Sequence, residues 1–115
     1  MYTVTARDLA NLDEVVIGIF HLIGSYQMLK MMLGAHSFVK GYFYDIDRPG
    51  LQFKFPRSNR INCCQIVLNR QTDEYCLIFI DAKDWRITVR GEYQDLPLAN
   101  VRSVFEKTTG LYLSL

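Results

Sequence analysis

Side chains capable of chemistry are few in this chain, and their spacing does not assemble a reactive set. The two histidines, His21 and His36, stand apart from any cysteine or acid at a spacing typical of metal ligands. Cys63 and Cys64 are adjacent, so in a strand their side chains point to opposite faces and cannot readily hold one ion. We therefore expect core or surface histidines, structural cysteines and no metal site.

Acidic side chains offer no clearer reaction. Asp45, Asp47 and Glu74 are the acids that invite comparison with a metal or acid–base set, but the first two flank a turn. Aspartate in a turn commonly caps backbone amides. The chain has no glycine-rich phosphate loop, and Ser37 or Ser58 as a nucleophile would need a base to which the sequence does not point. We expect a protein that is not an enzyme, with no catalytic residues and no cofactor.

Basic side chains interleaved with tyrosines are the surface feature that suits binding. The residues that we predict to contact a partner are Tyr42, Tyr44, Lys54, Arg86 and Arg90. On the solvent face of a sheet they could bind single-stranded nucleic acid by phosphate pairing and base stacking. They equally suit a protein partner, because tyrosine, tryptophan and arginine dominate interface energies. The plainer alternative is that the basic residues only keep a sheet face soluble and guard its edges.

Composition favours a protein partner over DNA. The chain has 115 residues, half of them apolar, which suits a single domain over 1–115. Its 13 basic residues nearly balance its 12 acidic residues. Proteins that bind DNA mainly through phosphates are usually more basic, so near-neutrality lowers that expectation without excluding it. Low net charge and many aromatic residues also make a homodimer a third hypothesis.

Cysteine usage and the N-terminal residues indicate a cytoplasmic protein. Three cysteines, two of them adjacent, argue against a disulfide framework. A hairpin turn near residues 70–73 would place Cys76 opposite Val67, away from the other two cysteines. Residues 1–8 lack the regions of a signal peptide. The apolar stretch Val15–Leu33 contains histidine, glutamine and lysine, so we interpret it as a buried helix and expect no membrane association.

Hydrophobic periodicity predicts the elements that must position these side chains. Apolar residues at three- and four-residue steps predict a long first helix that ends at Gly34. These residues are Leu12, Val16, Ile19, Ile23, Tyr26, Leu29 and Leu33. The period then changes to two, which predicts strands near 38–44, 51–55, 61–68, 74–80 and 85–90. The continuous apolar run 61–68 indicates a central strand covered on both faces. In the last strand we expect Trp85, Ile87 and Val89 to face inward, with Arg86, Thr88 and Arg90 outward.

A second helix and a short strand complete the predicted order. The helix opens at Asp95, with Pro97 in its first turn, and ends at Gly110. Its predicted buried stripe is Leu98, Val101, Val104 and Phe105. Alternating Leu111, Leu113 and Leu115 then predict a terminal strand that docks the C-terminus in the core. The prediction is an α+β fold: a long N-terminal helix, an antiparallel meander sheet of four to five strands, a C-terminal helix and a short terminal strand.

Four segments carry a resemblance to known proteins, and they are 31–39, 51–55, 62–69 and the C-terminal Phe105-Glu-Lys-Thr-Thr-Gly-Leu-Tyr-Leu-Ser-Leu. They resemble a family of small uncharacterised proteins encoded by bacteriophages, prophages and other mobile elements. The similarity runs in order over roughly 28–115, while 81–93 departs from the family pattern. The family brings no known activity and no site residues. The resemblance implies an accessory protein in the cytoplasm of a bacterial host, one that binds a host macromolecule, for example to inhibit a defence or regulatory factor.

Overall fold

The computed structural model describes residues 6–23, 29–31, 34–43 and 48–111, with the side chains from Leu12 onward. Its elements are α1 (Ala6–Ile23), β1 (His36–Tyr42), β2 (Pro49–Ser58), β3 (Ile61–Asn69), β4 (Glu74–Lys83), β5 (Arg86–Leu96), the 3₁₀ turn η1 (Leu98–Asn100) and α3 (Val101–Thr109). Residues 29–31 are also helical. The chain is an α+β protein, as the periodicity predicts.

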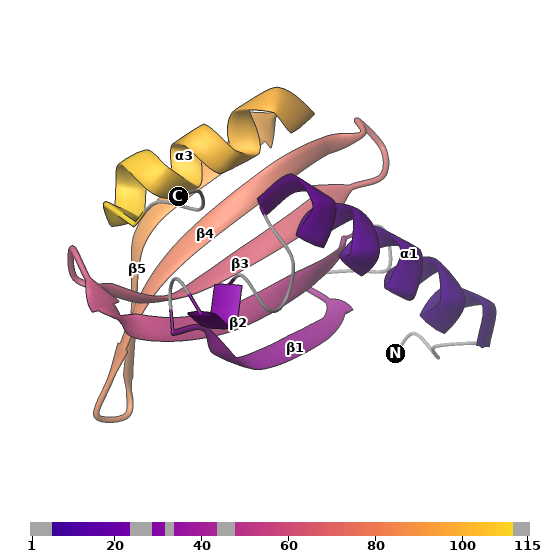
Figure 1. Cartoon of the computed structure of the whole chain (residues 1–115). Coiled ribbons are helices and arrows are strands. Elements are labelled where there is room, and N and C mark those ends of the chain that lie inside the picture. The colour runs from indigo at the N-terminus through magenta and orange to yellow at the C-terminus, as the bar shows by residue number, and fades with distance from the viewer. Residues whose placement is uncertain (1–5, 24–28, 32–33, 44–47, 112–115) are drawn as a thin grey trace.

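The five strands form one antiparallel meander in the order β1-β2-β3-β4-β5. Helices α1 and α3 lie over the same face of the sheet (Figure 1), where their apolar residues share one core with those of the strands. We call this side the helix face and the opposite side the open face. The predicted terminal strand falls on residues 112–115, which lie outside the described part of the chain.

Helix α1 and the helical residues 29–31 bury the described members of the predicted stripe. These members belong to the main core, and they are Leu12, Val16, Ile19, Ile23 and Leu29. Tyr26 and Leu33 lie outside the described residues, and α1 is described only as far as Ile23, so one continuous helix up to Gly34 stays a prediction. Gly34 does have the geometry of a helix end: its φ is 66°, its N–H donates to Lys30 O at 3.1 Å, and the N–H of Ala35 donates to Leu29 O at 3.2 Å. These two hydrogen bonds satisfy the last carbonyl groups of a helix. The residue that follows the helix has a left-handed backbone conformation and is usually glycine.

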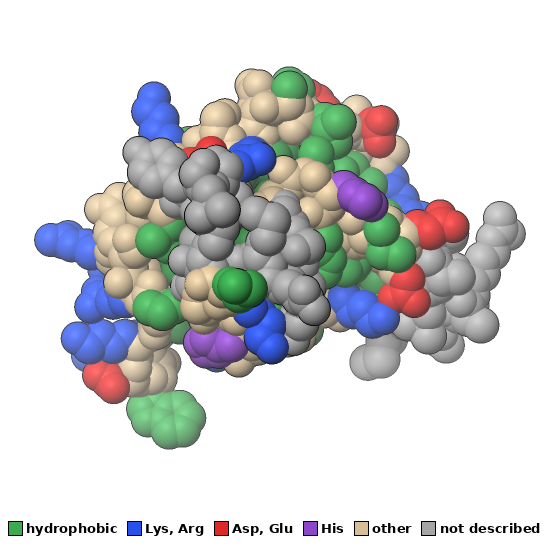
Figure 2. All heavy atoms as spheres, viewed as in Figure 1, with side chains coloured by type: hydrophobic (Ala, Val, Ile, Leu, Met, Phe, Trp, Pro, Cys, Tyr) green, Lys and Arg blue, Asp and Glu red, His purple; other side chains and the backbone are tan. Residues whose placement is uncertain are grey.

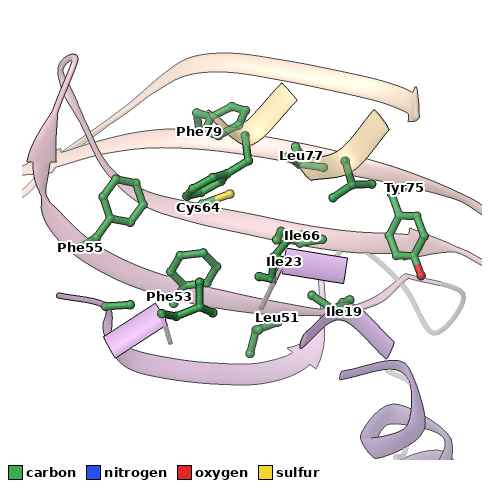
Figure 3. Close-up of a cluster of buried hydrophobic side chains, with 14 of the residues drawn as sticks. Ile19, Ile23, Leu51, Phe53, Phe55, Cys64, Ile66, Tyr75, Leu77 and Phe79 are labelled. Atoms are coloured by element: carbon green, nitrogen blue, oxygen red, sulfur yellow. The ribbon is translucent and has the colours of Figure 1, made fainter. Parts of the chain in front are cut away.

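The main core is a cluster of aromatic rings between the sheet and the helices. Phe53 and Phe55 of β2 and Phe79 of β4 point into the same space, beside Ile19 and Ile23 of α1 (Figure 3). All five side chains are essentially inaccessible to solvent. Burial of this much apolar surface supplies the main stabilisation that a domain of this size needs.

Strand β3 is buried on both faces, as its continuous apolar run predicts. Cys64 and Ile66 belong to the main core, whereas Cys63 and Val67 belong to a second cluster on the open face. Cys76 pairs with Val67, which confirms the predicted register. All three cysteines are buried free thiols. Burial raises the pKa of each thiol, most strongly that of Cys64, so these cysteines stay protonated and pack as small apolar residues.

Gly50 is expected to be intolerant of any side chain. A Cβ atom at Gly50 would lie 2.4 Å from the carbonyl oxygen of Ile66 and 2.9 Å from Cα of Val67. These are backbone atoms of β3, so relief requires the two strands to separate. We expect Gly50→Ala to lower the free energy of unfolding by about 1–3 kcal/mol.

Urea denaturation followed by circular dichroism measures this loss. The matched control is Gly41→Ala, because Gly41 is the cross-strand partner of Gly50 and a Cβ atom there meets nothing within 4 Å. Equal urea midpoints for Gly50→Ala and the wild type would show that β2 and β3 are less closely apposed than described.

The second helix begins later than the sequence predicts. Strand β5 runs on to Leu96, and η1 follows before α3 starts at Val101. Val101 and Phe105 are fully buried and Val104 is partly buried, as expected, but Leu98 is 57% exposed, so the prediction that it is buried is wrong. Leu98 belongs to the separate turn η1 that precedes α3, so it is not part of the helix that packs on the sheet.

Candidate binding surface on the β4–β5 arm

Strands β4 and β5 extend past the rest of the sheet as a two-stranded hairpin. Pairing between β3 and β4 ends at Cys63 with Ile80, whereas β4 and β5 remain paired as far as Lys83 with Arg86. We call residues 81–90 the arm. Figure 1 shows it projecting beyond the body of the sheet. An isolated two-stranded hairpin is marginally stable in water, so the base of the arm needs support.

Asn62 supports the arm where the backbone ladder stops. Its side-chain Nδ2 donates to Ala82 O at 2.7 Å, and its Oδ1 accepts from the N–H of Ala82 at 2.8 Å. The amide therefore replaces one cross-strand pair of backbone bonds and satisfies both polar groups of Ala82.

Asp81 is the second support and is the buried charge of the arm. The residue is only 5% exposed. Its Oδ2 accepts hydrogen bonds from Nη2 of Arg57 at 2.7 Å and from Nη2 of Arg90 at 3.3 Å. The carboxylate thus joins β2 to β5 across two intervening strands.

A β-bulge lies beside the contact between Arg90 and Asp81. Gly91 pairs with Phe79 and Val89 pairs with Ile80, so Arg90 is an extra residue without a partner in the ladder. Alternation from Thr88, which pairs with Asp81, places Arg90 on the same face as that carboxylate. A bulge bends the strand locally and re-aims side chains, which suits the reach of Arg90 back to Asp81.

The two arginines decide the ionisation of Asp81. Burial acts to raise the pKa of this carboxyl, but hydrogen bonds from Arg57 and Arg90, together with their positive charges, outweigh burial and hold the pKa below its ordinary value of 3.8. The folded state therefore favours the carboxylate more strongly than the unfolded chain does. At pH values above the ordinary pKa of 3.8, the ionised carboxylate contributes fully to the free energy of unfolding. This contribution is lost as the pH falls from 3.8 through the lowered pKa of the folded state.

Asp81→Asn is expected to remove this acid-dependent part of the stability. The amide cannot pair with two guanidinium groups, so the variant should be less stable than the wild type at pH 6 and closer to it at pH 3. Urea denaturation at the two pH values measures the difference. The control is Asp84→Asn in the exposed turn of the same arm. A stability difference that is the same at both pH values would contradict the assigned role of the ion pairs.

Basic side chains line a pocket on the helix face of the arm. The pocket has a volume of about 560 Å³, and its charged lining residues are Arg57, Asp81, Lys83, Asp84, Arg86 and Arg90. Thr88 completes the lining. Figure 2 shows Lys and Arg side chains gathered on the side of the molecule where the arm projects. Within the described residues, no acid lies at ion-pair distance from Lys83 or Arg86.

Apolar side chains occupy the open face and the tip of the arm. Trp85 is fully exposed, Ile87 is 74% exposed and Val89 is 55% exposed. Ile87 pairs with Ala82 and Val89 with Ile80, so the exposed residues adjoin the buried cluster of the open face. We call Trp85, Ile87 and Val89 the apolar strip.

The prediction that these three residues face inward is wrong. Alternation correctly places them on one face and Arg86, Thr88 and Arg90 on the other. However, the arm extends beyond the sheet, and its apolar strip lies on the face over which neither α1 nor α3 lies. Nothing among the described residues buries the apolar strip.

Trp85 also has an unfavourable backbone conformation. The turn at the tip has two central residues, Asp84 with φ of 49° and Trp85 with φ of 72°. Positive φ at both central residues is the pattern of a type I′ turn, in which glycine is the preferred second residue. A bulky residue in this region is uncommon and costs roughly 1–2 kcal/mol. Such strain is often retained at functional sites.

The structure does not bring the five predicted contact residues together. Arg86 and Arg90 share the pocket on the arm. Lys54 is exposed on the open face, opposite Cys63. Tyr42 is partly buried and packs against the main core, and Tyr44 lies outside the described residues. The sequence did not indicate that Arg57 and Asp81 form an ion pair, because the two residues are 24 positions apart in the chain.

Other kinds of site are not supported by the described residues. Across 6–23, 29–31, 34–43 and 48–111, no three histidine, cysteine or acidic side chains are grouped to hold a metal ion. No helix there is both long enough and apolar enough to cross a bilayer. No known protein family, curated protein or solved structure matches this chain.

Proposed function

We propose that this chain is a non-enzymatic binding protein that docks on another protein through the arm. The observation that carries the proposal is Trp85, which is fully exposed at the tip in a strained conformation. Tryptophan is the residue most enriched at the energetic centres of protein interfaces. The adjoining Ile87 and Val89 supply further apolar contact, and the arginines on the other side of the arm supply a polar border.

The expected partner is a host protein with an apolar cleft that admits a hairpin tip. A projecting arm suits insertion into a concave site better than it suits a flat contact. Together with the resemblance to proteins of mobile elements, this supports an accessory role in the cytoplasm of a bacterial host. Inhibition of a defence or regulatory factor by stoichiometric binding is the specific form of the proposal.

The experiment begins with affinity purification from bacterial lysate, with the wild type and Trp85→Gly as parallel baits. A candidate must be captured by the wild type alone, and it must then bind as a purified protein in isothermal titration calorimetry. Leu98→Ala is the control for adhesion through any exposed apolar side chain, since Leu98 is 57% exposed and lies outside the arm. Direct binding that Trp85→Gly leaves unchanged would refute docking through the tip.

A second copy of this chain is the competing occupant of the apolar strip. Light scattering at increasing protein concentration distinguishes the two cases. A monomer supports docking on another protein. A dimer that Trp85→Gly dissociates would assign the apolar strip to self-association.

Single-stranded nucleic acid is the second candidate partner, and the four basic side chains of the pocket favour it. Arg86 and Arg90 both line this pocket, which supports the proposal. Lys54 lies on the other face and Tyr42 packs against the core, so neither belongs to this pocket, and Tyr44 lies outside the described residues. Binding that falls steeply with salt in gel-shift titrations would support this function, and no shift at low ionic strength would exclude it.

A further inference from the structure

The pocket on the helix face of the arm has an excess of positive charge. Four basic side chains and two carboxylates line it, which leaves a net charge of +2. The basic groups come from three separate segments of chain: Arg57 from β2, Lys83 from the end of β4, and Arg86 and Arg90 from β5. Asp81 and Asp84 balance two of the four positive charges, so the excess of two charges would attract an anion.

Asp81 holds two of these groups in fixed positions. Its carboxylate is buried, and it accepts one hydrogen bond from each of Arg57 and Arg90. A guanidinium group has five N–H donors, so each arginine keeps donors for another acceptor. The two side chains remain 44% and 39% exposed. They are therefore held on one side and accessible on the other.

We propose that this pocket binds a phosphate group. A phosphate monoester carries a charge of about −1.5 to −2 at neutral pH, which matches the excess charge of the lining. Its three terminal oxygens can accept from Arg57, Arg90 and Arg86 at once, while Lys83 and the hydroxyl of Thr88 supply further donors. A carboxylate has one charge and two oxygens, and it would leave part of the lining unneutralised. This inference does not rest on docking through the apolar strip, which lies on the opposite face.

The test is a titration of the isotope-labelled protein with inorganic phosphate, monitored by amide chemical shifts. We expect saturable shifts at 57, 81–90 and their neighbours, with small changes at α1. Parallel titrations with thymidine 5′-monophosphate and with oligothymidylate identify the source of the phosphate. Tighter binding of the mononucleotide than of inorganic phosphate assigns the site to a nucleotide. Tighter binding of the oligomer assigns it to a nucleic-acid backbone, and equal binding assigns it to free phosphate.

Arg86→Gln is the decisive variant, because Arg86 is exposed and makes no ion pair among the described residues, so its loss should not unfold the protein. We expect phosphate affinity to fall about tenfold or more, as for loss of a charge-assisted contact. Lys54→Gln removes the same charge from the open face and should change affinity less than twofold. Two results would overturn the proposal: no shifts on the arm with phosphate, or equal losses in both variants. Binding of a polyglutamate peptide at the pocket without binding of phosphate would likewise overturn it.

Discussion

Replacing Phe105 with alanine is expected to lower the free energy of unfolding by about 3–5 kcal/mol. Phe105 is fully buried, and its ring centroid lies 6.0 Å from those of Phe53 and Phe55 and 6.2 Å from that of Phe79. It is therefore the ring through which α3 joins the aromatic core of the sheet. A helix of nine residues is unstable alone, so α3 depends on this contact.

Urea denaturation monitored by circular dichroism gives the magnitude, and hydrogen exchange identifies the element that is released. We expect amides of 101–109 to lose protection first in Phe105→Ala. Phe105→Leu keeps most of the apolar volume and should cost less, while Lys107→Ala on the exposed side of α3 should cost little. A loss below about 1 kcal/mol for Phe105→Ala would mean that α3 is held by other contacts.

Trp85→Gly is expected to stabilise the fold while it abolishes binding to the partner. Glycine adopts the left-handed conformation of the tip without steric cost, so the free energy of unfolding should rise by about 0.5–1 kcal/mol. Loss of an interface tryptophan typically costs at least about 2 kcal/mol, which is roughly a 30-fold loss of affinity. Opposite changes in stability and affinity are the signature of a residue retained for function.

Arg60→Gly is the control for this prediction. Arg60, with φ of 63°, is the second central residue of the β2–β3 turn, which has the same two-residue geometry. The Arg60→Gly variant should show a similar rise in the free energy of unfolding and should bind the partner with unchanged affinity. Thermal unfolding and titration calorimetry on both variants separate the effects. A Trp85→Gly variant that is less stable than the wild type would show that the ring packs on the fold.

The elements of the fold could largely be predicted from the sequence because their signals are local. The stripe from Leu12 to Leu29 repeats at the helical period, and Gly34 supplies the left-handed residue that ends the segment. The polar turn at 69–73 sets the register that places Cys76 opposite Val67. Each of these features depends on residues that are close together in the chain.

The candidate site could not be predicted to the same degree, because it depends on long-range geometry. Alternation shows that Trp85 and Ile87 share a face, but it cannot show that α1 and α3 both lie over the other face. Alternation places Arg90 on the face of Thr88, but it cannot show that this face of β5 lies beside Asp81 of β4. The pairing of Arg57 with Asp81 requires β2, β3 and β4 to be aligned first.

One signal for the site was present in the sequence. A tryptophan directly after Asp84, where a two-residue turn favours glycine, conflicts with the local rule for hairpins. Conflicts of this kind are expected where function overrides stability. The β2–β3 turn has the same conflict at Arg60, but only the arm combines it with an exposed tryptophan among the described residues.

Hydrogen exchange of the complex with its partner tests the central claim most directly. If the arm is the docking element, amides of residues 81–90 gain protection in the complex, while amides of α1 and of β1 exchange as in the free protein. If protection is instead confined to α1 or β1 and the arm exchanges unchanged, the arm is not the docking surface.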